Sequence, residues 1–249
     1  MTYALMTLFA CVATALNLAA GPRPSPVRLA ARPVVVLELF TSQGCSSCPP
    51  ADRVLADLTG PAARSGAAVY GLSFHVDYWN HIGWQDPFSS RLFTDRQRQY
   101  DRALRTQTYT PQLVVNGRQD IVGGQRSRIE QTIQTIQQQP PSAFVGVDGS
   151  LTRDAGSVTV NYELSAKGPY RVNVALVQNE ARTDVKRGEN GGRVLLNRNV
   201  VRAFRAVEQP GTAGRVTITV PDGLAAGQSS VLVYVQRTDN GQIVGAKSL

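Results

Sequence analysis

The sequence predicts two halves of different fold class, an α/β half that holds a cysteine pair and an all-β half after it. An apolar run at residues 34–40 leads into a Cys-x-x-Cys turn, Cys45 and Cys48, and an amphipathic stretch follows, which is a strand–turn–helix pattern. A second apolar run at 67–74 lies beyond that helix, which indicates a parallel β–α–β unit. From residue 143 onward, apolar residues alternate with polar ones and no helical period intervenes, which is typical of β-strands.

The N-terminal segment is predicted to direct export. The first 22 residues carry no charged side chain, and residues 4–18 form an apolar stretch followed by small residues. We therefore expect a signal peptide at 1–20, with cleavage near residue 20, and a lead-in at 21–32 that is rich in proline and arginine. The protein is then periplasmic or secreted, and it meets a membrane only if this segment stays uncleaved.

Composition narrows the choice of partners. The chain has 249 residues and a formal net charge of +8. Its basic residues are scattered, without a dense Lys/Arg run interleaved with aromatics, so we expect no nucleic-acid partner. Of three cysteines, Cys11 lies in the N-terminal apolar stretch, which leaves one pair and no disulfide framework. We expect no cofactor.

Local signals place further elements in the α/β half. Ser89 and Ser90 are N-cap candidates for a helix with one apolar face. An Asn116-Gly117 dipeptide between two short extended runs predicts a hairpin turn. Three isoleucines spaced three or four residues apart then predict a last amphipathic helix, which two prolines close.

The second half is predicted to be a β-sandwich-like domain. Its alternating segments lie at 158–164, 172–176, 216–220 and 231–235. Between them, residues 186–193 are polar and rich in glycine, which predicts a long hairpin tip. The domains are therefore expected at 33–139 and 142–249.

The cysteine pair is the candidate reactive centre. A helix N-terminus presents free N–H groups and a positive dipole end, which favours a thiolate at Cys45. Cys48 lies one turn later, close enough to close a disulfide. We expect Cys45 to be the exposed, attacking thiol of the reduced protein and Cys48 to be shielded. The same pair could instead be a permanent disulfide staple or half of a metal site.

The segment at residues 75–88, called here the aromatic loop, contains both histidines and both tryptophans of the chain. It begins at the C-terminal end of a predicted strand, the edge at which sites form in open α/β sheets. One interpretation makes His75, Asp77, Trp79 and Trp84 a substrate-facing wall of a pocket beside the cysteines. The other makes the loop an aromatic plug that covers the core.

The order of these elements resembles the thioredoxin fold. In that fold a cis-proline lies beside the cysteine pair, and Thr110 and Pro111 match its position. The stretches 37–52, 75–88 and 188–190 resemble the domain-of-unknown-function 1223 family of bacterial proteins, which are often secreted. The resemblance implies an α/β thioredoxin-like domain followed by an all-β sandwich-like domain.

The resemblance also suggests a carboxylate for proton transfer. Glu38 precedes the cysteine turn near the place where many thioredoxin-like proteins keep a buried carboxylate. Such a group takes or gives the proton of Cys48 as the disulfide forms and breaks. Glu38, Pro111 and the two cysteines are thus the predicted catalytic residues, and Thr110 joins the predicted substrate-binding set.

Three functions compete at this stage. The first is an exported thiol–disulfide oxidoreductase, in which Cys45 forms a mixed disulfide with a protein client or redox partner and Cys48 resolves it. The second is a non-catalytic binding module whose disulfide is passive. The third is a Zn or Cu(I) protein that uses the two cysteines with His75 and His81.

Overall fold

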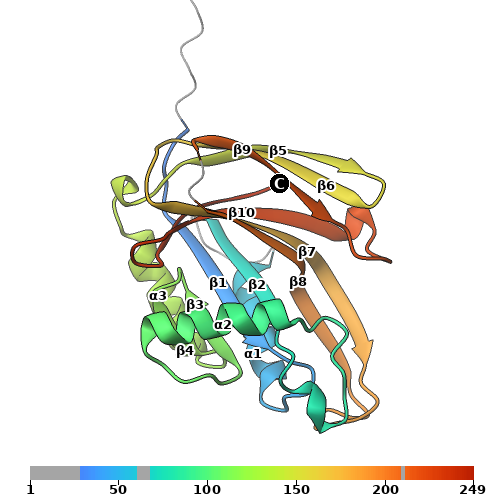
Figure 1. Cartoon of the computed structure of the whole chain (residues 1–249). Helices are drawn as coiled ribbons and strands as arrows, with labels where there is room; N and C mark the ends of the chain where they lie inside the picture. The colour runs from blue at the N-terminus through green and yellow to red at the C-terminus, as the bar shows by residue number, and fades with distance from the viewer. Residues whose placement is uncertain (1–28, 61–67, 209–210) are drawn as a thin grey trace, which may run out of the picture.

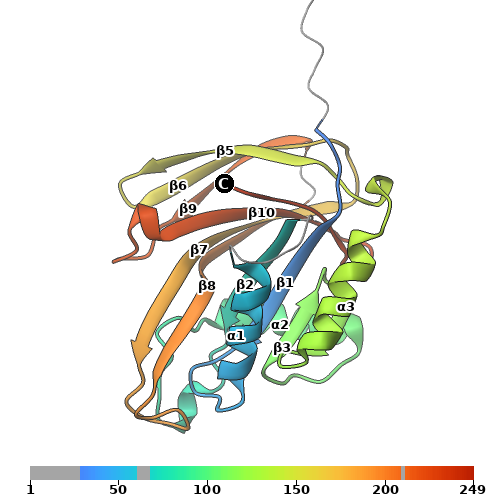
Figure 2. The same cartoon turned by 180° about the vertical axis from the view of Figure 1, so that it is seen from behind.

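The computed structural model describes residues 29–60, 68–208 and 211–249. The predicted signal peptide and most of the lead-in lie outside these residues. The molecule is built on one mixed eight-stranded sheet (Figures 1 and 2). In sheet order its strands are β11 (Ile243–Ser248), β10 (Ser229–Arg237), β7 (Tyr170–Asp184), β8 (Val194–Glu208), β2 (Ala68–His75), β1 (Val34–Thr41), β3 (Gln112–Val115) and β4 (Gln119–Val122).

Helices cover both faces of the β1 end of this sheet. α1 (Cys48–Thr59) and α3 (Arg126–Gln137) lie on one face, and α2 (Arg91–Leu104) lies on the other (Figures 1 and 2). All eight residues of β1 are therefore buried, which is why its sequence is a continuous apolar run rather than an alternating one. None of the helices in the described ranges is long and apolar enough to cross a membrane.

Three local predictions are confirmed. The Ser90 side chain caps α2 by accepting a hydrogen bond from a backbone N–H of its first turn. Asn116 and Gly117 adopt φ angles of 45° and 68°, the left-handed conformation that a tight turn between β3 and β4 requires. The Thr110–Pro111 peptide bond is cis.

The predicted fold class, an α/β thioredoxin-like domain followed by an all-β sandwich-like domain, is wrong. β8 pairs with β2 in parallel through Val200 and Ser73, so strands from the second half of the chain continue the sheet begun by the first half. The described residues contain more strand than helix, with only three α-helices among them. The error has a physical cause, because alternation shows which residues are buried but not which strands lie side by side.

A second, three-stranded sheet covers the β7–β10 part of the large sheet (Figure 1). A separate apolar core fills the space between the two sheets. Valines of β6, β7 and β10 dominate this core, which explains their alternating pattern. The three strands are β5 (Val147–Asp154), β6 (Ser157–Leu164) and β9 (Ala213–Thr219).

A buried ion pair lies between the large sheet and α2, and a tyrosine from the second half of the chain is hydrogen-bonded to it. The Glu38 carboxylate of β1 lies 2.7 Å from the Arg96 guanidinium of α2, and it also accepts hydrogen bonds from the hydroxyls of Tyr100 and Tyr234. The guanidinium packs over aromatic rings, with 4.8 Å to the centroid of Phe204. Burial alone would lower the pKa of Arg96. The nearby Glu38 charge outweighs this effect and raises the pKa overall, so the side chain stays charged. The Glu38 carboxylate is therefore bound by Arg96, Tyr100 and Tyr234 in the core.

We expect Arg96→Met to lower the free energy of unfolding by about 3–5 kcal/mol, because the Glu38 carboxylate would remain buried without its counter-charge. Chemical denaturation at neutral pH measures this change. The control is Arg91→Met, which removes an exposed ion pair with Asp95 and should cost less than about 1 kcal/mol. Equal losses in the two variants would contradict a central role for the buried pair.

Candidate functional site

The cysteine turn (residues 42–48) joins β1 to α1 and contains a disulfide between Cys45 and Cys48, with a Cα–Cα distance of 5.4 Å. Both cysteines are fully buried, whereas the two serines between them are exposed. In this disulfide form Cys45 is as shielded as Cys48, unlike the exposed thiol expected of the reduced protein. Attack on the disulfide therefore requires part of its surroundings to move. One candidate is the hairpin tip (residues 185–193) that connects β7 to β8.

The hairpin tip is hydrogen-bonded to the cysteine turn. The side chain of Asn190 donates to the carbonyls of Gln43 and Cys45, at 2.9 and 3.0 Å. The Glu189 carboxylate accepts from the backbone N–H of Ser46 at 2.9 Å, and hydrogen bonding to Ser46 lowers its pKa. Helix α1 has no acidic residue in its own first turn, so Glu189 supplies the negative charge that favours a helix N-terminus.

The aromatic loop packs on the other side of the cysteine turn. The Trp84 indole donates to the side chain of Gln43 at 3.1 Å, and the Trp79 indole donates to Thr110 at 2.8 Å. A side chain at Gly44 would put its Cβ atom 3.2 Å from the Cβ atom of Trp79, so the glycine allows the loop to approach closely. The structure thus brings both tryptophans and Thr110 to the turn, and Pro111 is buried directly after Thr110.

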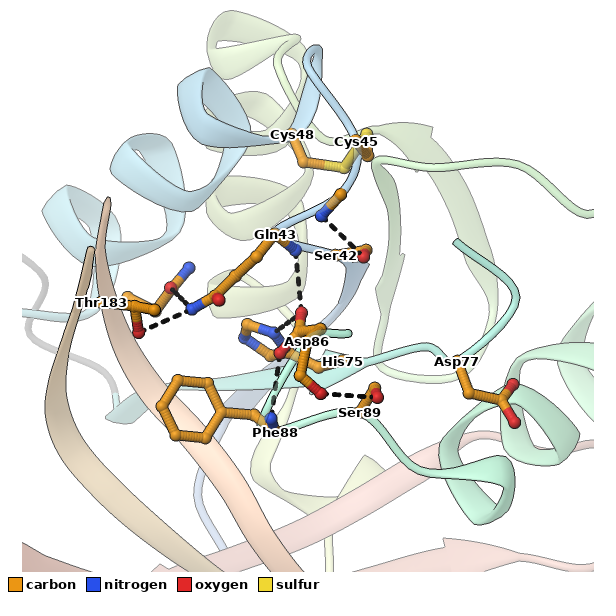
Figure 3. Close-up of polar contacts among 12 residues, drawn as sticks. Ser42, Gln43, Cys45, Cys48, His75, Asp77, Asp86, Phe88, Ser89 and Thr183 are labelled. Atoms are coloured by element: carbon orange, nitrogen blue, oxygen red, sulfur yellow. Dashed lines mark hydrogen bonds and ion pairs between the residues drawn. A yellow bond between two sulfur atoms is a disulfide. The ribbon is translucent and has the colours of Figure 1, made fainter. Parts of the chain in front are cut away.

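The other two predicted residues of the aromatic loop, Asp77 and His75, lie at different places relative to the disulfide. The Asp77 carboxylate accepts from the Thr94 hydroxyl at 2.5 Å and lies away from the disulfide (Figure 3). His75 lies beneath the turn, with its Nδ1 atom 2.7 Å from the Oδ2 atom of Asp86. Asp86 also accepts from the backbone N–H of Gln43 at 2.8 Å, so it connects His75 to the cysteine turn. Sequence reasoning did not select Asp86.

His75 and Asp86 form a fully buried pair. Burial alone lowers the pKa of His75, but the Asp86 carboxylate outweighs this effect and raises it. Burial likewise tends to raise the pKa of Asp86, yet the nearby His75 lowers it overall. Each shift favours the charged form of its side chain, and Asp86 accepts the hydrogen bond from the Gln43 N–H.

A second carboxylate lies on α1 itself. Asp52 follows Cys48 by four residues, a spacing that places both on one face of the helix. Its Oδ2 atom accepts from Asn197 at 3.2 Å, while its Oδ1 atom has no partner among the described residues. Burial raises the pKa of Asp52 to about 6, although the charge of His75 opposes this shift. The i, i+4 spacing from Cys48 was the signal in the sequence that could have identified Asp52.

The structure does not assemble the four ligands of the metal hypothesis. Cys45 and Cys48 are bonded to each other, and His75 is paired with an aspartate. His81 is exposed, and its Nδ1 atom lies 2.7 Å from the carbonyl oxygen of Tyr78. Across the residues that the structure describes, no group of three or more His, Cys, Asp or Glu side chains is placed to hold a metal ion.

The fold and site define a protein of mixed β-sheet architecture that carries a shielded disulfide at a helix N-terminus. The chain belongs to the DUF1223 family, described as a protein family of unknown function, which matches residues 36–236. The resemblance of the sequence to this family is thereby confirmed. A comparison with curated proteins finds no match.

Solved structures include a relative that shares most of the fold. The crystal structure of protein AGR_C_4864 from Agrobacterium tumefaciens is 31% identical in sequence, covers 86% of this chain and 93% of that one, and has a TM-score of 0.66. A domain of the outer membrane lipoprotein Omp28 from Porphyromonas gingivalis is 15% identical, with 45% and 90% coverage and a TM-score of 0.26. This second similarity is too weak to support a structural inference.

We expect Asn190→Ala to speed reduction of the disulfide by dithiothreitol about tenfold, because two hydrogen bonds that hold the hairpin tip on the cysteine turn are lost. Free thiols can be counted with a chromogenic disulfide reagent during the reaction. Arg187→Ala, at an exposed position of the same tip, is the matched control and should leave the rate unchanged. If Asn190→Ala reacts no faster than the control, the tip does not limit access.

We expect Asp52→Asn to stabilise the protein at neutral pH. The folded-state pKa of Asp52 is raised to about 6, so ionisation of this buried carboxyl destabilises the folded protein. This contribution to stability is fully present below about pH 4 and is lost as the pH rises through 6. The variant should therefore be more stable by roughly 2–3 kcal/mol above pH 7 and nearly equal below pH 4. Denaturation at several pH values measures this, with the exposed Asp57→Asn as the control. A stability difference independent of pH would contradict the raised pKa.

Proposed function

We propose that this protein is an exported thiol–disulfide oxidoreductase that acts on protein thiols through Cys45 and Cys48. The observation that carries the proposal is the disulfide at the N-terminus of α1 with a buried carboxyl group, Asp52, on the same helix face. A carboxyl whose pKa is close to neutral is suited to exchanging a proton with a thiol. The apolar N-terminal segment supports export to a compartment in which disulfides persist.

The proposed reaction takes two electrons from a client, whose two thiols lose their protons to water before they attack. A client thiolate attacks the Sγ atom of Cys45, the Cys45–Cys48 bond breaks, and Cys48 leaves as a thiolate that takes a proton from the Asp52 carboxyl. A second client thiolate attacks the client sulfur of the mixed disulfide and releases Cys45 as a thiolate, so the client becomes a disulfide. The reverse sequence reduces a client disulfide. A dithiol or disulfide redox partner restores the starting state.

The shielding of both sulfur atoms favours a second candidate function. In that alternative the disulfide never turns over, and the protein is a binding module whose cysteine pair fixes the start of α1. The buried charges near the turn would then serve only to hold its shape. The two candidates differ in one measurable property, the reduction potential, because structural disulfides resist reduction by the glutathione pool.

We expect the Cys45/Cys48 pair, equilibrated with glutathione redox buffers, to show a reduction potential between about −270 and −120 mV, the range of catalytic pairs. A potential below about −300 mV would establish the passive staple instead.

We also expect Cys48→Ser to accumulate a mixed disulfide with a thiol peptide at Cys45, which mass spectrometry detects. Cys45→Ser should accumulate much less. In reduced protein, Asp52→Asn should slow oxidation by glutathione disulfide about tenfold or more.

A further inference from the structure

A groove of about 960 Å³ lies between α1 and β8, on the side of α1 that faces the β7–β8 hairpin. Figure 2 shows this helix beside the two long strands. The groove starts at Pro49, the residue directly after Cys48, and continues along α1 to Gly60. Its other wall consists of Arg193, at the end of the hairpin tip, and of Val194, Leu195, Leu196 and Arg198 in the first part of β8. Its volume is within the range of pockets that bind ligands.

The β8 wall of this groove has an unpaired edge. Along Val194 to Arg198, β8 forms a regular antiparallel ladder with β7. On its other side β8 meets β2 through one pair only, Val200 with Ser73, and the described strands supply no partner for the preceding residues. Backbone N–H and C=O groups on such an edge can pair with an extended peptide segment.

The groove also has exposed apolar side chains. Val194 and Leu196 are 51% and 48% exposed, and they are two of the four large apolar side chains that are exposed in the described residues. They are two positions apart on one strand, so they lie on the same face of β8. Exposed aliphatic groups beside an open strand edge fit apolar side chains of a bound segment.

The groove lining carries more positive than negative charge, with four arginines against the two carboxylates of Asp52 and Asp57. Arg53 and Arg193 are exposed, and neither takes part in an ion pair among the described residues. Arg126 and Arg198 add two further guanidinium groups, which are paired with surface carboxylates. The surplus of arginine complements acidic side chains and repels basic ones.

We propose that this groove binds an extended polypeptide segment in which apolar and acidic side chains alternate. The β8 edge provides main-chain pairing, Val194 and Leu196 contact the apolar side chains, and the arginines contact the acidic ones. If the proposed oxidoreductase function holds, the groove is the client site, because a segment bound there lies next to the cysteine turn. The binding itself does not depend on that function.

The test uses two fluorescent ten-residue peptides that contain no cysteine, one alternating valine with glutamate and the other alternating valine with lysine. Fluorescence anisotropy with the full-length protein measures binding. We expect the glutamate peptide to bind about tenfold more tightly than the lysine peptide. Arg53→Glu and Leu196→Ser should each weaken binding of the glutamate peptide about fivefold to tenfold.

Matched control variants lie on α2, which covers the opposite face of the sheet. Arg102→Glu and Leu92→Ser change an exposed arginine and a 50% exposed leucine there, and neither should alter peptide binding. Equal affinities for the two peptides, or equal losses in groove and α2 variants, would overturn the proposed groove. Since the peptides carry no thiol, binding by a protein whose reduction potential marks a passive disulfide would support the groove and refute only the oxidoreductase.

Discussion

The buried pair of Glu38 and Arg96 is the interaction on which the architecture depends. A carboxylate at the centre of a fully buried strand is costly unless its charge is matched. The partners of Glu38 on β1 come from α2, through Arg96 and Tyr100, and from β10, through Tyr234. These elements lie far apart in the sequence. The carboxylate therefore gains its full set of partners only when β10 lies on the sheet that the first strands begin.

The buried polar residues beneath the cysteine turn also connect segments that lie far apart in the sequence. Gln43 is the common member: its backbone N–H donates to Asp86, and its side chain donates to Thr183 (Figure 3). The same side chain also donates to Asn197 and accepts from Trp84. The aromatic loop and the β7–β8 hairpin thus meet at one amide side chain. Because the network is buried, loss of one member leaves others without partners, which makes the position of the turn well defined.

Much of the local structure could be predicted from the sequence, because local signals act over a few residues. The cap at Ser90, the turn at Asn116 and the helix after Cys48 are examples. Pairing of β8 with β2 could not be predicted, since periodicity carries no information about neighbouring strands. The same limit explains the expectation for Glu38: its place near the cysteines was visible in the sequence, but its partners on α2 and β10 were not.

The hairpin tip that lies over the cysteine turn has a consequence for biosynthesis. Glu189 and Asn190 contact residues 143 to 147 positions earlier in the chain. A chain that emerges N-terminus first exposes Cys45 and Cys48 long before these two residues exist. Contacts of such large sequence separation also form slowly in folding. The newly made protein therefore passes through an interval in which the cysteine pair is open to any oxidant or thiol around it, and the hairpin tip closes over whichever redox state that interval has produced.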